Sequence, residues 1–259
     1  MESLGKPPII EAWIGLRFEP NPDRSPWTGE AARVFFSQYS EQFPDAEFEA
    51  ERRVSLQGGS LRELPQVVGQ ETAIRKVQVY NQDRSRCIQW TEDKLIYNVA
   101  EAGSSYPGFS QLCDEAMDKF RDFIQRFEPL QIRDAVIAYI DVIEIPLKNG
   151  RIERLEDFFK FAPDPPEKPF GLMTAFSYRN VFDCPVDPGP LIVNVTPLST
   201  DAGIGRFHMD WQKISEDVNT LDLSIVKKRL DRSHEYMRDC FRESLTEEAW
   251  RLFDPRGQD

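Results

Sequence analysis

The sequence predicts an α+β protein built from two similar β-α-β-β-β-α halves, residues 1–130 and 131–259, which form one or two antiparallel sheets covered by helices. Three observations predict this class. In the opening run PPIIEAWIGLRFEP, the residues of one strand face recur at every second position and are apolar. Two apolar stripes with helical spacing each follow a set of short strand-like segments, and this order of elements recurs in the second half. We expect one compact unit that ends in a long C-terminal helix.

The first half opens with a half-buried strand. Ile10, Ile14 and Phe18 share one face, Trp13 and Arg17 share the other, and a proline brackets each end. The remaining predicted elements are a helix over 29–43, a long loop over 49–70, strands over 73–81, 87–91 and 95–100, and a helix over 110–127. Proline follows both helices and ends them.

The second half repeats this order at a spacing that drifts from about 127 residues down to roughly 100–110, so the repeat is one of element order and not of strict sequence. The predicted elements are a strand over 135–145, a short helix near 155–159, a proline-rich loop over 162–171, strands over 172–182, 191–196 and 205–213, a long helix over 221–245 and a last helix over 247–253. Thr246 is a suitable N-cap for the last helix.

Composition and charge narrow the class of function. The chain has 259 residues, 40% of them hydrophobic, with 18 Phe and 5 Trp, which is enough for a sizeable core. Its net charge is −12. Because nucleic-acid affinity depends on Lys and Arg that neutralise phosphates, this balance argues against a nucleic-acid partner. It suits a protein that covers a basic surface of a partner protein.

The chain is predicted to be cytoplasmic. No stretch approaches the roughly 18–20 apolar residues of a membrane helix, and the N-terminal MESLGKPP lacks a secretory pattern. The four cysteines are scattered and are expected to be free thiols in a reducing compartment.

Motifs that carry catalysis are scarce. The sequence contains no phosphate-binding loop, no nucleophile elbow and no zinc-protease motif, so neither cofactor nor metal is predicted and enzymatic activity is left open. In RFHMDWQK, His208 and Asp210 share a strand face with Arg206, which suggests either an acid–base pair or an exposed polar face. His234 lies on the long helix outside its apolar stripe.

Polar residues inside apolar strands are better candidates for a site. Asp141 lies within AVIAYIDVIEI, where an unpaired buried carboxylate costs several kcal/mol, so it needs a partner, a polar cavity or water. Arg17 or Arg179 could supply the partner. On the first strand, Glu11 and Arg17 flank Trp13, and we expect the other half of the protein or a partner to cover this face.

Three segments together resemble a family of sporadically distributed, uncharacterised prokaryotic proteins of about this length. They are PPIIEAWIGLRFEP, DAVIAYIDVIEIP and HEYMRDCFRESLTEEAWRLF. The family's mid-chain strand carries an Arg-Tyr-x-Asn core. Here Tyr139 matches the Tyr, whereas Ala138 and Asp141 stand in place of the Arg and the Asn. The resemblance implies no activity, but a patchy distribution implies mobile loci of the phage-defence or toxin–antitoxin type.

These observations predict a protein-interaction component without catalytic activity of its own. The alternative is a small-molecule-binding or enzymatic domain with a pocket between the sheet and the long helix. The residues predicted to bind the partner or the ligand are Glu11, Trp13, Arg17, Tyr139, Asp141, Tyr178, Arg179, His208 and Asp210.

Overall fold

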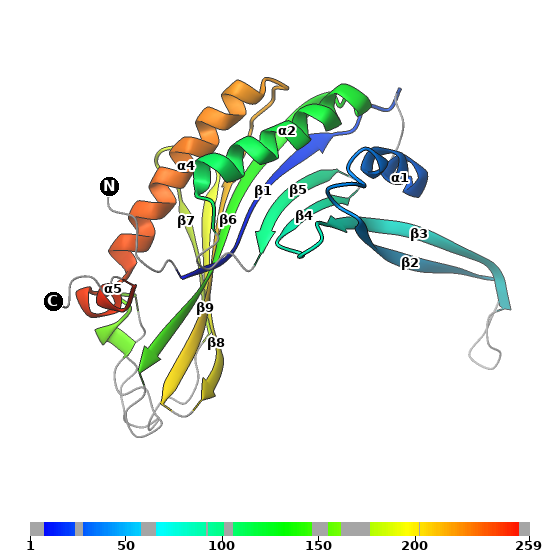
Figure 1. The fold of residues 1–259 in the computed structure, drawn as a ribbon. Coiled ribbons are helices and arrows are strands. Elements are labelled where there is room, and N and C mark those ends of the chain that lie inside the picture. Colours follow the sequence, from blue (N-terminus) through cyan, green and yellow to red (C-terminus); the bar gives the residue numbers. More distant parts are fainter. Residues whose placement is uncertain are drawn as a thin grey trace.

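The computed structural model describes residues 8–23, 28–57, 66–91, 93–100, 106–146, 155–161, 177–201 and 203–253. They form one nine-stranded antiparallel sheet with the order β2-β3-β4-β5-β1-β6-β9-β8-β7, and the helices lie on one side of it (Figure 1). The predicted α+β class is therefore confirmed.

The strands are β1 (Ile9–Glu19), β2 (Asp45–Gln57), β3 (Gln66–Tyr80), β4 (Arg86–Thr91), β5 (Lys94–Ala100), β6 (Gln131–Pro146), β7 (Tyr178–Asp183), β8 (Pro190–Asp201) and β9 (Ile204–Ser215). The helices are α1 (Gly29–Ser37), α2 (Phe109–Phe127), α4 (Leu223–Ser244) and α5 (Glu247–Phe253), with a single 3-10 turn, η2 (Leu155–Asp157). No helix in the described part of the chain is long and apolar enough to span a bilayer.

β1 is the middle strand of the sheet, and its fully apolar face is the one toward the helices. It pairs with β5 on one side and with β6 on the other. Ala12, Ile14 and Leu16 point toward the helices and are fully buried. The central strands therefore form the side of the hydrophobic core that faces the helices.

α2 and α4 cover the middle of the sheet side by side (Figure 1). In α2 the predicted apolar stripe is buried, namely Leu112, Cys113, Ala116, Met117, Phe120 and Phe123. The helix ends at Glu128, which adopts a left-handed conformation before Pro129. α4 begins where the Asp222 side chain accepts a hydrogen bond from the Ser224 amide.

A buried ionic cluster attaches α4 to the far strands. Arg229 Nε donates to Asp187 Oδ1 at 2.7 Å, and Lys213 Nζ lies 3.6 Å from Asp187 Oδ2. The fully buried Lys213 also donates to the carbonyls of Pro188 and Gly189 at 3.3 and 3.1 Å. Because these acceptors replace water, the lysine can be buried in its charged form.

The prediction of a loop over 49–70 is wrong, because β2 and β3 cover most of that range as a long hairpin. Over residues 45–51 of β2, charged and apolar residues alternate as in a strand, but every side chain is exposed, so β2 buries no face there. Glu49 forms a cross-strand ion pair with Lys76 at 2.8 Å, and Glu51 forms one with Arg75. Glu47 pairs at 2.5 Å with Arg84 in the turn after β3.

The second half departs from the first in two places. A single 3-10 turn stands where a short helix was predicted, although Phe158 and Phe159 are buried as its apolar pattern requires. Five of the described strands precede residue 130 and four follow it, so the predicted duplication is not shown. The proline-rich loop over 162–171 and the start of the strand predicted over 172–182 lie outside the described residues.

Candidate functional site

The face of the sheet opposite the helices is the candidate functional site, and we call it the helix-free face. On β1 it carries Glu11, Trp13 and Arg17, the alternate positions to the buried Ala12 and Ile14. No helix of the described residues lies over it (Figure 1). Six of the nine predicted residues are on this face: Glu11, Trp13, Arg17, Arg179, His208 and Asp210.

Three of these six residues form a single row across the strands. Glu11 on β1 is opposite Ile140 on β6, which is opposite Asp210 on β9. Asp210 is opposite Asn194 on β8, which is opposite Arg179 on β7. With roughly 4.8 Å between strands, Glu11 and Asp210 stand about 10 Å apart in this row.

The two carboxylates in the row are held by amides and not by cations. Asn98 Nδ2 donates to Glu11 Oε1 at 2.5 Å, and Asn194 Nδ2 donates to Asp210 Oδ2 at 3.1 Å. Within the described ranges neither carboxylate forms an ion pair. Asn98 is itself buried, and its Oδ1 accepts no hydrogen bond there. Both acids can therefore accept a cation from outside.

The Trp13 ring packs beside Gly15 on the helix-free face. A side chain at Gly15 would come within 3.3 Å of the Trp13 ring and 3.2 Å of Lys94. Lys94 Nζ lies 5.0 Å from the ring centroid, and burial, followed by the charge of Arg17, lowers the pKa of this lysine. Arg17 forms an ion pair with Asp134 at 2.9 Å. The half-buried indole therefore lies among charged groups, with the Lys94 ammonium near its ring.

The predicted row of Arg206, His208 and Asp210 is present, but it is not an acid–base pair. Arg206 donates to Glu144 on β6 at 2.9 Å, and Asp210 accepts from amides. His208 stands opposite Val142 and Thr196 and forms no hydrogen bond with Asp210. The exposed polar strand face describes this row better than the acid–base pair does.

Asp141 is on the helix side, and its expected ion pair with Arg17 or Arg179 is wrong. Both arginines are on the helix-free face, so the sheet separates them from Asp141. Only 3% of Asp141 is exposed, and this burial raises its pKa to about 7. Tyr178 is also on the helix side, stacked on Phe161 with a centroid distance of 5.0 Å.

Tyr139 belongs to a buried polar cluster beside Asp141. Its hydroxyl lies 2.8 Å from His234 Nδ1, and Tyr106 packs edge-on against its ring. The imidazole of His234 stacks on Phe109 at 4.2 Å. Burial lowers the pKa of His234 to about 4, so the imidazole is neutral.

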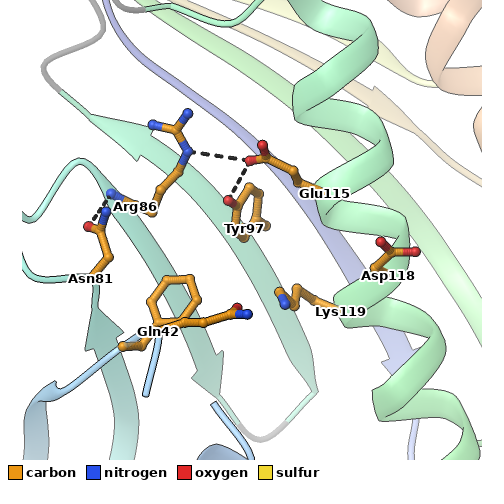
Figure 2. A pocket seen from close by; sticks show the side chains of 8 residues that line it. Gln42, Asn81, Arg86, Tyr97, Glu115, Asp118 and Lys119 are labelled. Atoms are coloured by element: carbon orange, nitrogen blue, oxygen red, sulfur yellow. Dashed lines mark hydrogen bonds and ion pairs between the residues drawn. The ribbon is translucent and has the colours of Figure 1, made fainter. Parts of the chain in front are cut away.

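A polar pocket of about 350 Å³ lies where α2 faces β4 and β5, and the sequence did not suggest it (Figure 2). Its lining consists of Gln42, Phe43, Asn81, Arg86, Tyr97, Glu115, Asp118 and Lys119. These residues come from five separate parts of the chain, so no local pattern could reveal the pocket. It contains none of the nine predicted residues.

Glu115 organises one wall of this pocket. Its carboxylate accepts from the Tyr97 hydroxyl at 2.6 Å, from Gln111 at 2.8 Å and from Arg86 at 3.3 Å. Partial burial opposes ionisation, but these donors hold the pKa of Glu115 below its ordinary value. Lys119 Nζ lies 4.3 Å from the centre of the Tyr39 ring. The wall is therefore charged and already hydrogen-bonded.

The chain matches no family model and no curated protein with which it was compared. The resemblance to sporadically distributed prokaryotic proteins consequently stays a prediction. Two residues at the positions of that family's Arg-Tyr-x-Asn core, Tyr139 and Asp141, are buried beneath the helices.

Proposed function

We propose that the protein is a non-catalytic interaction component and that a partner protein docks on the helix-free face. The observation that carries this proposal is the placement of every described helix on the other side of the sheet (Figure 1). A sheet face with a half-buried indole among charged residues has the composition of an interaction surface, in which aromatic anchors are surrounded by polar groups.

The partner that fits this face has a basic surface. The chain carries a net charge of −12, and Glu11 and Asp210 lack cationic partners among the described residues. Arg or Lys side chains spaced about 10 Å apart on the partner would meet both carboxylates. The resemblance to sporadically distributed prokaryotic proteins supports a further part of the proposal, namely that the protein is encoded in a locus of the defence or toxin–antitoxin type.

A matched pair of double variants tests this function. The tagged chain is purified gently from its source cells as wild type, as Glu11→Lys with Asp210→Lys, and as Glu235→Lys with Glu248→Lys. The last two acids are exposed on α4 and α5 and make the same change in net charge. We expect wild type and the helix variant to retain one stoichiometric partner and the face variant to lose it.

Two results would contradict the proposal. One is a partner that the face variant retains as well as the helix variant does. The other is recovery of the chain alone in all three preparations. The decisive result is the difference between two variants of equal charge. A protein that binds non-specifically would be captured by both variants and would therefore not support the proposal.

A second candidate function is small-molecule binding, and the pocket beside α2 favours it. About 350 Å³ lies within the size range of ligand pockets, with Lys119 and Arg86 as charged contacts. A metabolite and nucleotide library tests it by thermal shift, because a ligand at 100 times its Kd adds about 2.7 kcal/mol of stability. A response that Lys119→Met abolishes supports this candidate, and a flat response rejects it.

We also propose that the two halves derive from a duplicated unit. What supports this is the pairing at the centre of the sheet. In each half the first strand pairs with the last strand of that half, β1 with β5 and β6 with β9, and β1 pairs with β6 antiparallel. An alignment of homologues that shows no similarity between the halves in any member would count against it.

A further inference from the structure

The two edges of the sheet differ in their protection against a further strand. The β2 edge carries acids at alternate positions: Asp45, Glu47, Glu49 and Glu51. A second copy of that edge, paired antiparallel about Glu47, Phe48 or Glu49, would place acid opposite acid, which is one way natural edges avoid pairing. These registers of the β2 edge with a copy of itself are therefore disfavoured.

The β7 edge has the opposite character. β7 pairs with β8, and within the described residues no other strand or hydrogen bond occupies its outer side. Val181 and Phe182 on this strand are 59% and 43% exposed. An exposed apolar edge strand with free N–H and C=O groups is a template for strand pairing.

The charges on β7 are complementary to those of a second β7. On the helix-free face Arg179 and Asp183 stand two residues before and two residues after Val181. An antiparallel pair centred on Val181 therefore places Arg179 of each copy opposite Asp183 of the other. Both side chains are exposed, and neither forms an ion pair within the described chain.

We propose that two copies of the chain associate through antiparallel pairing of their β7 strands about a two-fold axis at Val181. Such an interface is self-complementary, as two-fold symmetry requires. An antiparallel ladder has two-fold axes at both its hydrogen-bonded and its non-hydrogen-bonded residue pairs. The axis at Val181 is therefore possible whether the two Val181 residues form a hydrogen-bonded pair or a non-hydrogen-bonded one. The net charge of each chain is screened beyond roughly 8 Å at physiological salt.

The dimer would join two nine-stranded sheets edge to edge. Because the axis is perpendicular to the sheet, both helix layers lie on one side and both helix-free faces on the other. The proposal is independent of the docking partner: it concerns the edge of the sheet, and the Glu11 and Asp210 variants leave it intact.

Charge reversal with complementation tests the pairing. Arg179→Asp alone makes both cross-strand pairs acidic, and Asp183→Arg alone makes both basic, so each single variant should associate about tenfold more weakly than wild type. An equimolar mixture of the two restores both pairs between unlike chains. We expect sedimentation over a concentration series to show wild type and the mixture approaching twice the 30.0 kDa chain mass at the same concentration, and each variant alone approaching it at a concentration about tenfold higher.

Cross-linking at the axis gives a second measurement. In a Cys184→Ser background, Val181→Cys places two thiols on paired strands with Cα atoms about 4.5–5.5 Å apart, a distance that a disulfide spans. Oxidation should give a covalent dimer, whereas Leu198→Cys, which is similarly exposed on β8, should give little. Wild type at chain mass up to about 100 μM would overturn the proposal, and so would a mixture no larger than its components.

Discussion

The Tyr139 hydroxyl and His234 Nδ1 lie 2.8 Å apart, and this hydrogen bond joins the central strand β6 to the long helix α4. Burial raises the pKa of Tyr139 well above its ordinary value, so its hydroxyl stays protonated. Burial also keeps His234 neutral, so the tautomer of its imidazole decides which of the two groups donates. The bond ties the only histidine on α4 to the sheet.

Removal of this hydrogen bond should lower the free energy of unfolding. Tyr139→Phe leaves a half-buried imidazole nitrogen without its hydrogen-bond partner, which typically costs about 1–3 kcal/mol. Urea denaturation measures the change. Tyr80→Phe is the control, because the Tyr80 hydroxyl makes a 3.3 Å contact to Glu47 at the surface and its loss should cost about 0.5 kcal/mol or less. Equal losses in the two variants would contradict the prediction.

Asp141 and His234 make opposite contributions to the pH dependence of stability. His234 has a folded pKa of about 4 against an ordinary 6.5, so in that window only the unfolded chain binds its proton, and stability falls as pH falls. Asp141 has a folded pKa of about 7 against 3.8, so the folded chain binds the extra proton, and stability falls as pH rises. The two contributions offset each other between about pH 4 and 6.5.

Single substitutions should reveal the two slopes. Relative to wild type, Asp141→Asn should gain stability as pH rises from about 4 to 7, and His234→Gln should lose stability as pH rises from about 4 to 6.5. Each slope is at most about 1.4 kcal/mol per pH unit. Urea denaturation at several pH values measures both differences. Parallel profiles for wild type and both variants would show that neither group titrates as described.

Lys213 should be necessary for the attachment of α4. Lys213→Met leaves Asp187 with one buried cation fewer and removes the donor to three carbonyls, so we expect a loss of about 3 kcal/mol. Lys228→Met, at an exposed position on α4, should change stability by about 0.5 kcal/mol or less. A thermal unfolding midpoint for Lys213→Met equal to that of Lys228→Met would be inconsistent with the buried cluster.

Gly189 should tolerate no side chain. Its φ is 103°, and an added Cβ would lie 2.3 Å from the Ile214 carbonyl oxygen. Gly203 has a similar φ of 94° but open space around it. Gly203→Ala should therefore cost about 1 kcal/mol of strain, and Gly189→Ala about 2 kcal/mol or more, because the clash adds to the strain. Denaturation midpoints of the two variants give the comparison.

Local periodicity predicted the elements that bury a face, and it failed where burial does not stabilise the element. β1 and α2 follow directly from apolar spacings of two and of three to four. β2 and the first part of β3 were not predicted, whereas the second part of β3, where Val77 and Val79 are buried, matches the strand predicted over 73–81. The alternation of charged and apolar residues over 45–51 is itself a strand signal, although all seven side chains are exposed.

The candidate site required information that one strand does not contain. Alternation places Asp141 and Tyr139 on one face of β6, but only the pairing register shows that Arg17 is on the other face of the sheet. The pocket residues meet through contacts between α2, β4, β5 and the turns beside them. Register and helix placement are long-range properties, so the sequence could group the residues of the helix-free face within each strand but not across strands.

The outer part of the β2–β3 hairpin extends away from the helices (Figure 1), and exposed ion pairs link its strands, whereas Val77 and Val79 join the core where β3 lies against α1. Added electrolyte weakens exposed ion pairs and strengthens apolar burial. Ionic strength therefore acts on the molecule unevenly: concentrated salt loosens this arm while it tightens the body. Amide exchange should accelerate in the arm under conditions that slow it in β1 and β6.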